Sequence, residues 1–325
     1  MASDLPSPDR PLRIGTRGSP LALAQARETR DRLAHALALP ETAFEIVPIS
    51  TAGDRVTDRP LKELGGKGLF TLEIEEGLLA GRIDLAVHSM KDMPTAFPPG
   101  LVIDCTLPRE DVRDAFVAHG DGGIAELPSG ARVGTSSLRR RAQLLRRRPD
   151  LQVVEFRGNV QTRLRKLEEG VAACTFLAMA GLNRLGRSDV PARPIPPEEM
   201  LPAVAQGAIG VERRAEDRRV AAMLEAIHDR PTGLRVAAER AFLAELDGSC
   251  QTPIAGLAEL SGGTLRLQGE ILRPDGTEVV EDAVEGPAED GAELGRALAR
   301  ELLRRAGPGF FEWRHPISGA SSAVG

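Results

Sequence analysis

The order of strand-like and helix-like segments constrains the fold of this chain more than any other feature. Through roughly the first 100 residues, apolar runs of strand length alternate with amphipathic helical stretches, which is typical of an α/β unit with a mostly parallel sheet. Ser19 and Pro20 fit the cap and first turn of the first helix. The expected strands are residues 12–15, 43–50 and 82–89, and the expected helices are 19–39 and 70–81.

The same alternation restarts near Asp114 and ends in the proline-rich residues 191–202, which we interpret as a linker. A third unit begins near Pro231, where a helix precedes strand-like alternation and a closing helix, a pattern that indicates an α+β domain. The expected strands of the second unit are 131–137, 151–158 and 173–180, and the expected helices of the third are 234–246 and about 291–305.

Charge is unevenly distributed along the 325 residues, which carry a formal net charge of -5. Residues 132–165 hold 10 arginines and only two acids, Asp150 and Glu155. Solvated helix faces would account for single arginines, whereas clustering of this density favours a site for a polyanion or polycarboxylate. A chain of this length has material for two or three domains.

Three expected strand-to-helix turns present arginine beside free backbone N–H groups. Helix N-termini attract anions, and ligands of open α/β folds bind at the carboxyl ends of strands. Each turn alone is also explained as an ordinary helix cap, but their recurrence favours a shared anionic ligand. The turns are Thr16-Arg17-Gly18-Ser19, Gly134 to Arg140, and Arg157-Gly158-Asn159 with Arg163 on the following helix.

Several classes of function are poorly supported. Aromatic residues make up 3% of the chain and tyrosine is absent, so stacking platforms for nucleic acid are scarce. The sequence Gly65-Gly66-Lys67-Gly68 lacks the Ser or Thr of a P-loop, and we find no metal-ligand spacing and no apolar run long enough for a membrane span. The N-terminal residues lack the apolar segment of a secretory signal, and three widely spaced cysteines indicate a reducing compartment.

Two single residues suggest covalent or proton chemistry. Cys250 lies in a Gly-Ser-Cys-Gln-Thr-Pro loop, where a thiol would be accessible, whereas Cys105 and Cys174 lie in apolar strands and are expected to be inert. Asp92, which follows Lys91 after a strand, could manage protons or stabilise a cation. Taken alone, Asp92 is better explained as a helix cap and Cys250 as a structural residue.

Together these segments closely resemble the porphobilinogen deaminase, or hydroxymethylbilane synthase, family. The matching motifs occur in the family's order over about residues 13–254, and the weaker tail, 255–313, resembles the family's third domain. The motifs are RIGTRGSPLALAQA (13–26), LGGKGLFTLEIE (64–75), DLAVHSMKDMPT (84–95), REDVRDAF (109–116), VGTSSLRRRAQL (133–144), FRGNVQTRLRKL (156–167), LAMAGLNRLG (177–186), LPAVAQGAIGVE (201–212) and AERAFLAELDGSCQTPI (238–254).

The resemblance implies an α/β fold of two type II periplasmic-binding-protein-like domains, joined by a double crossover, and a smaller α+β C-terminal domain. Domain 1 would comprise residues 11–107 and 203–225, domain 2 residues 108–202, and domain 3 residues 228–314, with 1–10 and 315–325 as disordered tails.

The resemblance also implies a cytoplasmic, monomeric transferase of tetrapyrrole and heme biosynthesis. Such an enzyme joins four porphobilinogen molecules head to tail, loses ammonia at each addition and frees 1-hydroxymethylbilane by hydrolysis. Its product would pass to uroporphyrinogen-III synthase, and neither nucleic acid, membrane nor metal is expected as a partner.

The same resemblance assigns the site residues. Cys250 would carry a dipyrromethane cofactor through a thioether, and Asp92 would be the catalytic carboxylate that stabilises positive charge on pyrrole nitrogens. The arginines would hold the acetate and propionate groups of each pyrrole unit, and residues 55–68 would form a flexible lid. The implied cofactor- and substrate-binding residues are Arg17, Ser19, Asp54, Lys67, Phe70, Ser89, Lys91, Thr135, Ser137, Arg139, Arg140, Arg157, Gly158, Arg163, Arg184 and Gln206.

The sequence departs from the family pattern at Ala173, where many relatives have Asp, and at Gly18, where a larger polar residue is common. Neither position belongs to the implied chemistry. The main rival is a small-molecule carboxylate-binding module of the solute-binding-protein type, which needs the arginines but not an accessible thiol together with Asp92. A nucleic-acid-binding protein is a more distant alternative.

Overall fold

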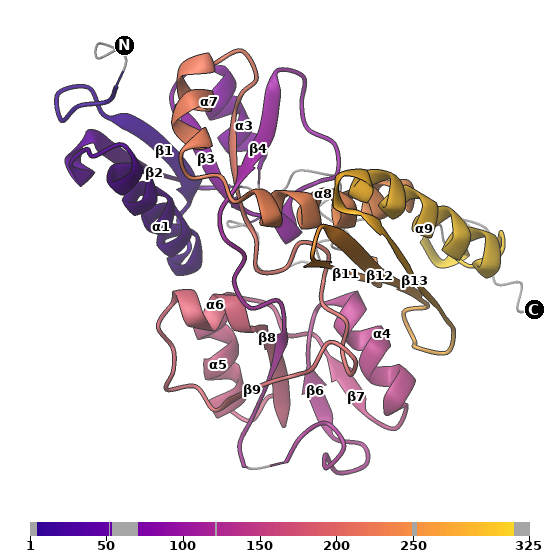
Figure 1. The fold of residues 1–325 in the computed structure, drawn as a ribbon. Helices are drawn as coiled ribbons and strands as arrows, with labels where there is room; N and C mark the ends of the chain where they lie inside the picture. The colour runs from indigo at the N-terminus through magenta and orange to yellow at the C-terminus, as the bar shows by residue number, and fades with distance from the viewer. Residues whose placement is uncertain (1–4, 52, 54–70, 121, 249–251, 315–325) are drawn as a thin grey trace, which may run out of the picture.

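The strands of the computed structural model form three sheets with helices packed against them (Figure 1). The structure describes residues 5–51, 53, 71–120, 122–248 and 252–314. The following expected site and tail residues lie outside the described residues: Asp54, Lys67, Phe70, Cys250, 1–4 and 315–325.

The first sheet has the strand order β2-β1-β3-β10-β4, with β1, β2 and β3 parallel and β10 antiparallel to both of its neighbours. Apolar residues of α1 and α7 pack on one face, and Ile74 and Leu78 of α3 pack on the other. The elements are β1 (Leu12–Arg17), α1 (Pro20–Ala36), β2 (Phe44–Ile49), α3 (Leu72–Leu79), β3 (Leu85–Ser89), β4 (Leu101–Thr106), β10 (Ile209–Arg214) and α7 (Arg218–Glu225), with short 3-10 helices η2 (Glu41–Ala43) and η4 (Met90–Asp92).

The second sheet repeats this plan with the order β7-β6-β8-β5-β9. Leu144 of α4 packs with Phe116 and Phe176 on one face, while α5 and α6 contribute Leu164 and Leu182 to the other. Its elements are β5 (Asp114–Ala118), β6 (Arg132–Gly134), α4 (Leu138–Arg147), β7 (Gln152–Val154), α5 (Val160–Glu168), β8 (Cys174–Ala178), α6 (Met179–Arg184) and β9 (Ala192–Pro194).

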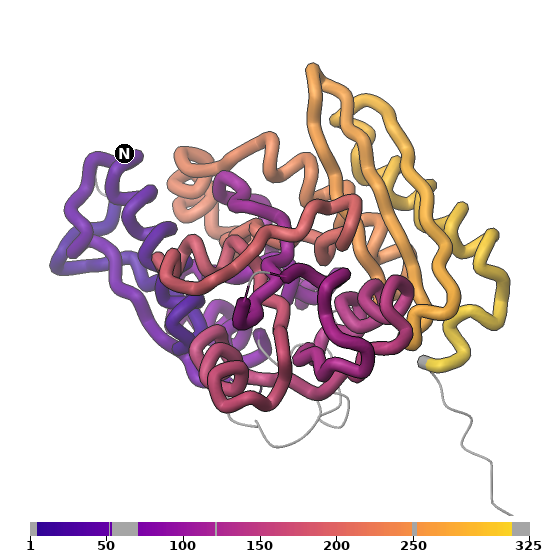
Figure 2. Tube along the Cα trace, turned by 90° about the horizontal axis from the view of Figure 1, so that it is seen from below, coloured from indigo at the N-terminus to yellow at the C-terminus, as the bar shows by residue number. Residues whose placement is uncertain are grey.

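The third sheet is an antiparallel meander of three strands with α8 and α9 packed against it. Phe242 of α8, Leu265 of the sheet and Leu298 of α9 belong to one buried cluster. Figure 2 shows these C-terminal elements along one side of the other two units. The elements are α8 (Arg230–Glu245), β11 (Ile254–Ser261), β12 (Thr264–Leu272), β13 (Val279–Pro287), η5 (Ala288–Asp290), α9 (Gly291–Ala306) and η6 (Glu312–Arg314).

Two crossover segments connect the first and second sheets, one between β4 and β5 and the other between β9 and β10. They run side by side: the Leu107 N–H donates to Ile209 O at 3.1 Å, and the Glu110 N–H donates to Gly207 O at 3.2 Å. Gly207 has a φ of 86°, and a Cβ there would lie 2.5 Å from Glu110 O. Only glycine allows this close approach.

The expected fold class is confirmed: two mixed α/β sheets, two crossovers and a smaller C-terminal α+β unit. Interpreting 191–202 wholly as a linker was wrong, because Ala192–Pro194 forms β9 and pairs with β5. A strand at the edge of a sheet can contain proline, so the prolines in this segment did not exclude a strand. Residues 5–10, expected in a disordered tail, form a turn in which Ser7 and Arg10 exchange backbone hydrogen bonds of 3.0 and 3.2 Å.

Within the described part of the chain, no helix combines the length and the apolar character needed to cross a membrane.

The hairpin between β12 and β13 packs directly on α4, because a Cβ at Gly276 would lie 2.5 Å from the Arg146 N atom. Near this contact the Arg146 guanidinium pairs with Glu281 at 2.7 Å and lies 3.9 Å from Glu270. Burial raises the pKa of Glu270 to about 7, against the opposing effect of Arg139. The C-terminal unit therefore buries a carboxyl group against the arginine-bearing helix.

This burial predicts a pH-dependent stability. The folded state holds the Glu270 proton up to a pH of about 7, whereas the unfolded chain releases it near its ordinary value of 4.5, so stability falls as pH rises through this window. Glu270→Gln should remove this penalty, which amounts to at most about 3 kcal/mol above pH 7. Urea unfolding at pH 5 and pH 8 should show that the variant has a higher free energy of unfolding than the wild type mainly at pH 8.

Glu281→Gln is the matched control on the neighbouring strand. Hydrogen bonding to Arg146 lowers the pKa of Glu281, so its charged form contributes stability that is lost as pH falls. The control should therefore not gain stability at pH 8. If both variants changed the pH dependence of stability in the same way, the raised pKa of Glu270 would be contradicted.

Candidate active site

The first part of the site is the turn that follows β3. Ser89 ends the strand, and its hydroxyl and the Gln25 amide of α1 lie 2.8 Å apart in a hydrogen bond. The buried Met90 then starts the 3-10 turn and donates its N–H to Ala208 O at 3.0 Å. Asp92 ends this turn with an exposed side chain, so its carboxylate points away from the packed core.

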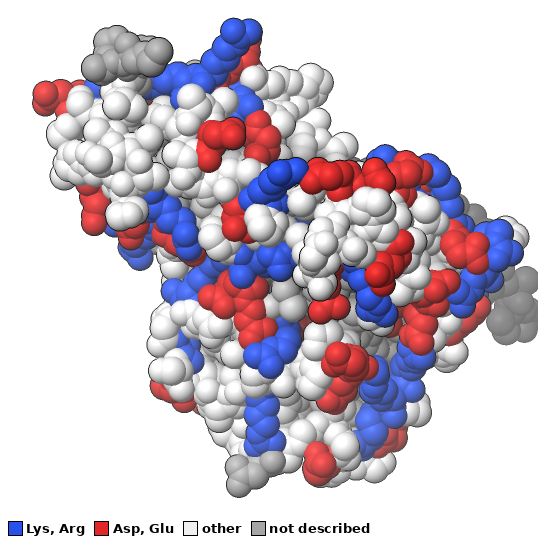
Figure 3. All heavy atoms as spheres, in the orientation of Figure 1, with Lys and Arg blue, Asp and Glu red and all other residues white. Residues whose placement is uncertain are grey.

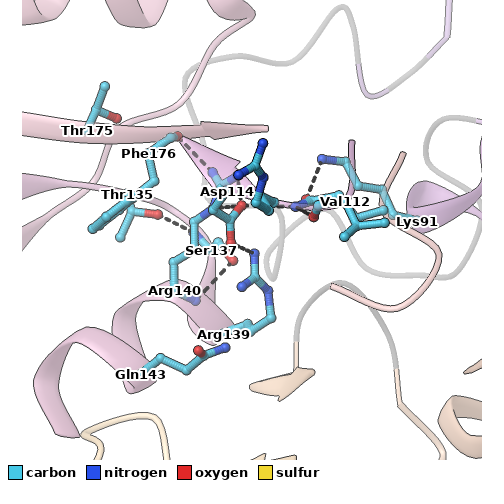
Figure 4. A network of polar contacts seen from close by, with 12 residues as sticks. Lys91, Val112, Asp114, Thr135, Ser137, Arg139, Arg140, Gln143, Thr175 and Phe176 are labelled. Carbon is cyan, nitrogen blue, oxygen red and sulfur yellow. Dashed lines mark hydrogen bonds and ion pairs between the residues drawn. The ribbon is translucent and has the colours of Figure 1, made fainter. Parts of the chain in front are cut away.

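The second part is a buried ion-pair network at the start of α4 (Figure 4). Ser137 caps the helix by accepting the Arg140 N–H at 3.4 Å. The Arg140 Nε and Nη2 donate to Asp114 Oδ1 at 3.0 and 2.6 Å, and Arg139 Nη2 lies 2.8 Å from Asp114 Oδ2. Asp114, the first residue of β5, is fully buried. One internal carboxylate thus holds two adjacent guanidinium groups.

The charges in this network stabilise one another. Burial alone would raise the pKa of Asp114, but Arg139 and Arg140 outweigh burial and hold that pKa well below its usual range. Burial lowers the pKa of Arg139, and Asp114 opposes the shift. Two guanidinium groups without Asp114 would repel each other at low dielectric, so the carboxylate is required for the pair to be buried.

Gln206 connects this network to the Asp92 turn. From the second crossover its Nε2 donates to Asp114 Oδ1 at 3.1 Å and to Val112 O at 2.8 Å. Its Oε1 accepts from Lys91 Nζ at 3.2 Å. Figure 4 shows Lys91 and Asp114 at opposite ends of this path. The chain of contacts therefore runs from the first α/β unit to the second.

The pKa of Lys91 lies below its ordinary value. Burial is the main cause and, together with Arg140 and Arg139, lowers this pKa to about 8 against the opposing effects of Asp92 and Asp114. An amine with such a pKa is mostly protonated at neutral pH but has an accessible neutral form. It can therefore bind a carboxylate or exchange a proton.

The turn after β7 adds a further cation. Asn159 caps α5 by accepting the Thr162 N–H at 2.9 Å. Gly158 has a φ of 121°, and a Cβ there would lie 2.6 Å from the Thr162 side chain, so this turn requires glycine. Arg163 Nε donates to Gly158 O at 2.9 Å, and burial lowers the pKa of Arg163 to about 10, with Asp92 opposing the shift. Asp92 therefore lies close enough to Arg163 for its charge to affect the guanidinium.

The remaining expected residues lie at strand ends and caps. Ser19 caps α1 by accepting the Ala22 N–H at 3.3 Å, and Thr135 Oγ1 accepts the Ser137 N–H at 3.2 Å. Arg17 ends β1 and Arg157 precedes Gly158, and both are partly buried with polar partners.

Arg184 lies apart from the arginine pair. Its Nε pairs with Glu28 of α1 at 3.1 Å, and its Nη2 donates to Gly207 O at 3.0 Å. It lines an open groove of about 650 Å³ together with Arg27, Asp31 and other α1 residues. Among the described residues, Arg184 therefore shares no hydrogen-bond or ion-pair partner with Arg139 or Arg140.

The excess of positive charge in residues 132–165 is partly compensated in the fold. Arg139 and Arg140 share Asp114, Arg146 pairs with Glu281, and Arg148 pairs with Asp150. Figure 3 shows basic and acidic side chains interspersed on the face in view. Clustering in sequence therefore did not produce a continuous basic surface on that face.

Donors remain available for a carboxylate-bearing ligand. The Arg139 Nε is buried and has no hydrogen-bond partner among the described residues, and Arg163 is bonded only to a backbone carbonyl there. Unmet buried donors are costly, so they indicate a missing acceptor. This donor set fits a cofactor that carries acetate and propionate groups.

Sequence reasoning missed two residues of this site. Asp114 lies in the motif REDVRDAF. The available signal was a charged residue at the start of a strand whose apolar residues must be buried. Gln25 lies on the buried face of α1 and gave no signal beyond its helical position. Cys105 and Cys174, in contrast, are buried as expected, and burial raises the pKa of each to about 12.

Two α/β units joined by a double crossover, with an exposed carboxylate on one and clustered guanidinium groups on the other, are suited to a ligand that carries carboxylates. Residues 12–222 match the family model "Porphobilinogen deaminase, dipyromethane cofactor binding domain", and residues 233–304 match "Porphobilinogen deaminase, C-terminal domain". The chain belongs to the porphobilinogen deaminase family. It has porphobilinogen deaminase activity in tetrapyrrole synthesis and contains the dipyromethane cofactor binding domain.

Among curated relatives, the porphobilinogen deaminase of Paracoccus denitrificans (strain Pd 1222) is 69% identical over 311 residues, which cover 96% of this chain and 99% of that protein. Solved structures with more distant similarity include the Bordetella pertussis BvgS periplasmic VFT2 domain, at 15% identity and a TM-score of 0.40 over 66% of this chain and 86% of that chain. A periplasmic substrate-binding protein of a Coxiella burnetii ABC transporter is 16% identical, with a TM-score of 0.40 over 70% of this chain and 96% of that chain. Similarity this distant bears on neither fold nor ligand.

The Asp114 network makes a prediction about stability. Arg140→Leu should destabilise the protein by about 3 kcal/mol, because it leaves a buried carboxylate with only one of its two cations. Arg163→Leu, which removes a guanidinium bonded only to a carbonyl among the described residues, should cost less than half as much. Urea unfolding of both variants tests this difference, and equal losses would contradict the structural role of Asp114.

Proposed function

We propose that this enzyme joins four porphobilinogen molecules head to tail on a dipyrromethane primer attached to Cys250. Ammonia is lost at each addition, and hydrolysis frees 1-hydroxymethylbilane. The observation that supports this most strongly is the placement of Asp92 on the first unit opposite cations of the second, in a chain of this family.

The primer would lie among the donors of the second unit. When bound, dipyrromethane supplies the free pyrrole position to which the first substrate molecule is added. The buried Arg139 Nε and the Arg163 guanidinium would hold its carboxylates, since both retain donor capacity. Arg140 would contribute mainly by fixing Asp114, because its Nε, Nη1 and Nη2 all donate within the chain.

The substrate carboxylates would be held around the Asp92 turn. Each porphobilinogen brings an acetate and a propionate, and a growing chain accumulates these groups, so several cations and hydroxyl donors are needed. Three of the proposed contacts, Asp54, Lys67 and Phe70, lie outside the described part of the chain. The full set of proposed contacts is Arg17, Ser19, Asp54, Lys67, Phe70, Ser89, Lys91, Thr135, Ser137, Arg157, Gly158, Arg184 and Gln206.

Asp92 would act on the ring nitrogen of the reacting pyrrole. Positive charge develops at this atom as ammonia leaves and as the new bond forms. An exposed carboxylate at the end of a fixed turn can stabilise that charge and accept a proton without reorganising. Lys91, with its pKa near 8, would orient a substrate carboxylate beside it.

We further propose three functional domains: residues 11–107 with 203–225, residues 108–202, and residues 228–314. The strand order supports this division, since β10 lies between β3 and β4 in the first sheet. We propose a cytoplasmic monomer whose unstable open-chain product passes to uroporphyrinogen-III synthase.

The competing function is a carboxylate-binding module without turnover. Binding needs the cations alone, whereas catalysis also needs Asp92 and the cofactor thiol. Incubation of the purified protein with porphobilinogen distinguishes the two, because only the enzyme consumes the substrate and releases ammonia.

Cys250→Ala should abolish cofactor attachment and activity. The purified wild type should exceed its sequence mass by two linked pyrrole units, and the variant should match its sequence mass. Cys105→Ala and Cys174→Ala are the controls, because both thiols are buried with pKa values near 12 and do not form thiolates at neutral pH. An active wild type without added mass would exclude this attachment.

Asp92→Asn should reduce kcat by about 10²- to 10³-fold, the usual effect of removing a preorganised charge partner. The variant should still carry the cofactor mass, because slow attachment can be completed during expression. Asp92→Glu should retain more activity than Asp92→Asn, since it keeps the charge. Single-turnover kinetics with intact-mass measurement tests both variants, and wild-type turnover by Asp92→Asn would show that the Asp92 carboxylate is not needed for catalysis.

A further inference from the structure

The helix that leads to the cysteine loop also contacts the Asp92 turn. α8 ends at Glu245, five residues before Cys250 in the sequence. Near its C-terminal end, the partly buried Arg240 points away from the helix and donates to a run of backbone carbonyls. Its Nη2 donates to Pro94 O at 2.7 Å and to Thr95 O at 3.4 Å, and its Nη1 donates to Met93 O at 3.4 Å.

These three carbonyls belong to the residues that directly follow Asp92. Residues 93–95 lie outside any helix or strand, so their backbone carbonyls need hydrogen-bond partners from elsewhere in the chain. One planar guanidinium can bond several of them at once, which a lysine ammonium cannot do with the same fixed geometry. Arg240 therefore fixes the path of the chain immediately after Asp92.

The same turn is anchored on its other side by apolar packing. Met90 and Met93, which flank Lys91 and Asp92, belong to the buried cluster that contains Phe242 of α8. A Cβ at Gly210 would lie 2.1 Å from the Met90 sulfur, so Met90 lies directly on the backbone of β10. The turn is thus held by methionine side chains from within and by Arg240 at its exit.

Arg240 remains cationic although it has no carboxylate partner within ion-pair distance among the described residues. Burial lowers its pKa to about 10, so the side chain is charged at neutral pH. Its other contact is the Phe97 ring, whose centroid lies 5.0 Å from the guanidinium carbon. A partly buried cation compensated only by carbonyls and a ring is costly to keep, which points to a role beyond stability.

We propose that Arg240 is a positioning residue that sets the orientation of Asp92 and couples it to α8, the helix that precedes Cys250 in the sequence. This inference rests on the proposed catalytic role of Asp92. Arg240 itself does not contact the substrate.

The test is a double-mutant cycle on the holoenzyme. Arg240→Met should lower kcat about 10- to 100-fold with KM changed less than about threefold, because a displacement near 1 Å at a reacting group has effects of this size. The double variant Asp92→Asn with Arg240→Met should be no slower than Asp92→Asn alone, since Arg240 acts only through Asp92. Additive losses would overturn the proposal.

Arg240→Lys and guanidinium rescue separate positioning from folding. Arg240→Lys should fold and keep part of kcat, and methylguanidine at millimolar concentration should raise the kcat of Arg240→Met while methylamine should not. Intact mass should show the cofactor in each variant. Failure of methylguanidine to raise kcat would overturn the proposal.

Arg235→Met is the matched control on the same helix. Among the described residues, the Arg235 guanidinium donates only to Pro231 O and the Thr232 hydroxyl in the first turn of its own helix, so its loss should leave kcat within about twofold. Wild-type kcat in Arg240→Met, with a slow Asp92→Asn, would refute this inference alone. Wild-type kcat in Asp92→Asn would instead refute the proposed function.

Discussion

A single buried carboxylate, Glu239 on α8, joins all three units of the molecule. Its Oε2 accepts the Ala205 N–H of the second crossover at 2.6 Å, and its Oε1 accepts the Ala258 N–H of β11 at 2.8 Å. Arg109 of the first crossover donates to both oxygens, at 2.6 and 3.0 Å. Because Glu239 and the Arg109 side chain are almost fully removed from solvent, losing either would leave an uncompensated charge, and the crossovers would lose their fixed relation to α8.

The same rule of charge compensation determines what the arginine cluster can offer a ligand. Asp114 uses the Arg140 side chain almost completely and leaves the Nε of Arg139 unbonded among the described residues. Internal carboxylates thus decide which cations are structural and which are available for binding. A count of arginines in the sequence cannot make this distinction, because Asp114 lies outside the basic segment and joins it only through the fold.

Local periodicity, capping and glycine in the sequence were sufficient to predict most strands and helices and the strand-end turns that carry Ser19, Ser137 and Gly158. The return of the chain to the first sheet through residues 203–225 was expected only from the family resemblance, because the sequence pattern did not indicate β10 or α7. β9 and β13 were missed, because an edge strand needs no apolar pattern: Val279–Pro287 carries several acids and is mostly exposed. The partners of Arg140, Arg184 and Arg240 could not be predicted, since each depends on residues far away in sequence.

The position of Asp92 relative to the arginines is set by the chain connections together with one contact between the two α/β units, in which Arg184 of α6 pairs with Glu28 of α1. In the described part of the chain, the hydrogen bonds that connect Lys91 to Asp114 pass through Gln206, whose backbone belongs to the second crossover. That crossover is bonded to the first one and, through Ala205, to Glu239 of α8.

Any rotation of the two α/β units about the crossovers therefore has to move around this fixed centre. The residues closest to it, Lys91 and Gln206, should move least, while cations further along the strand ends, such as Arg163, should change their distance from Asp92 most. An enzyme that lengthens its bound chain needs movement that is small near the crossovers and larger further away. The point of reaction must stay constant while the space beside it grows.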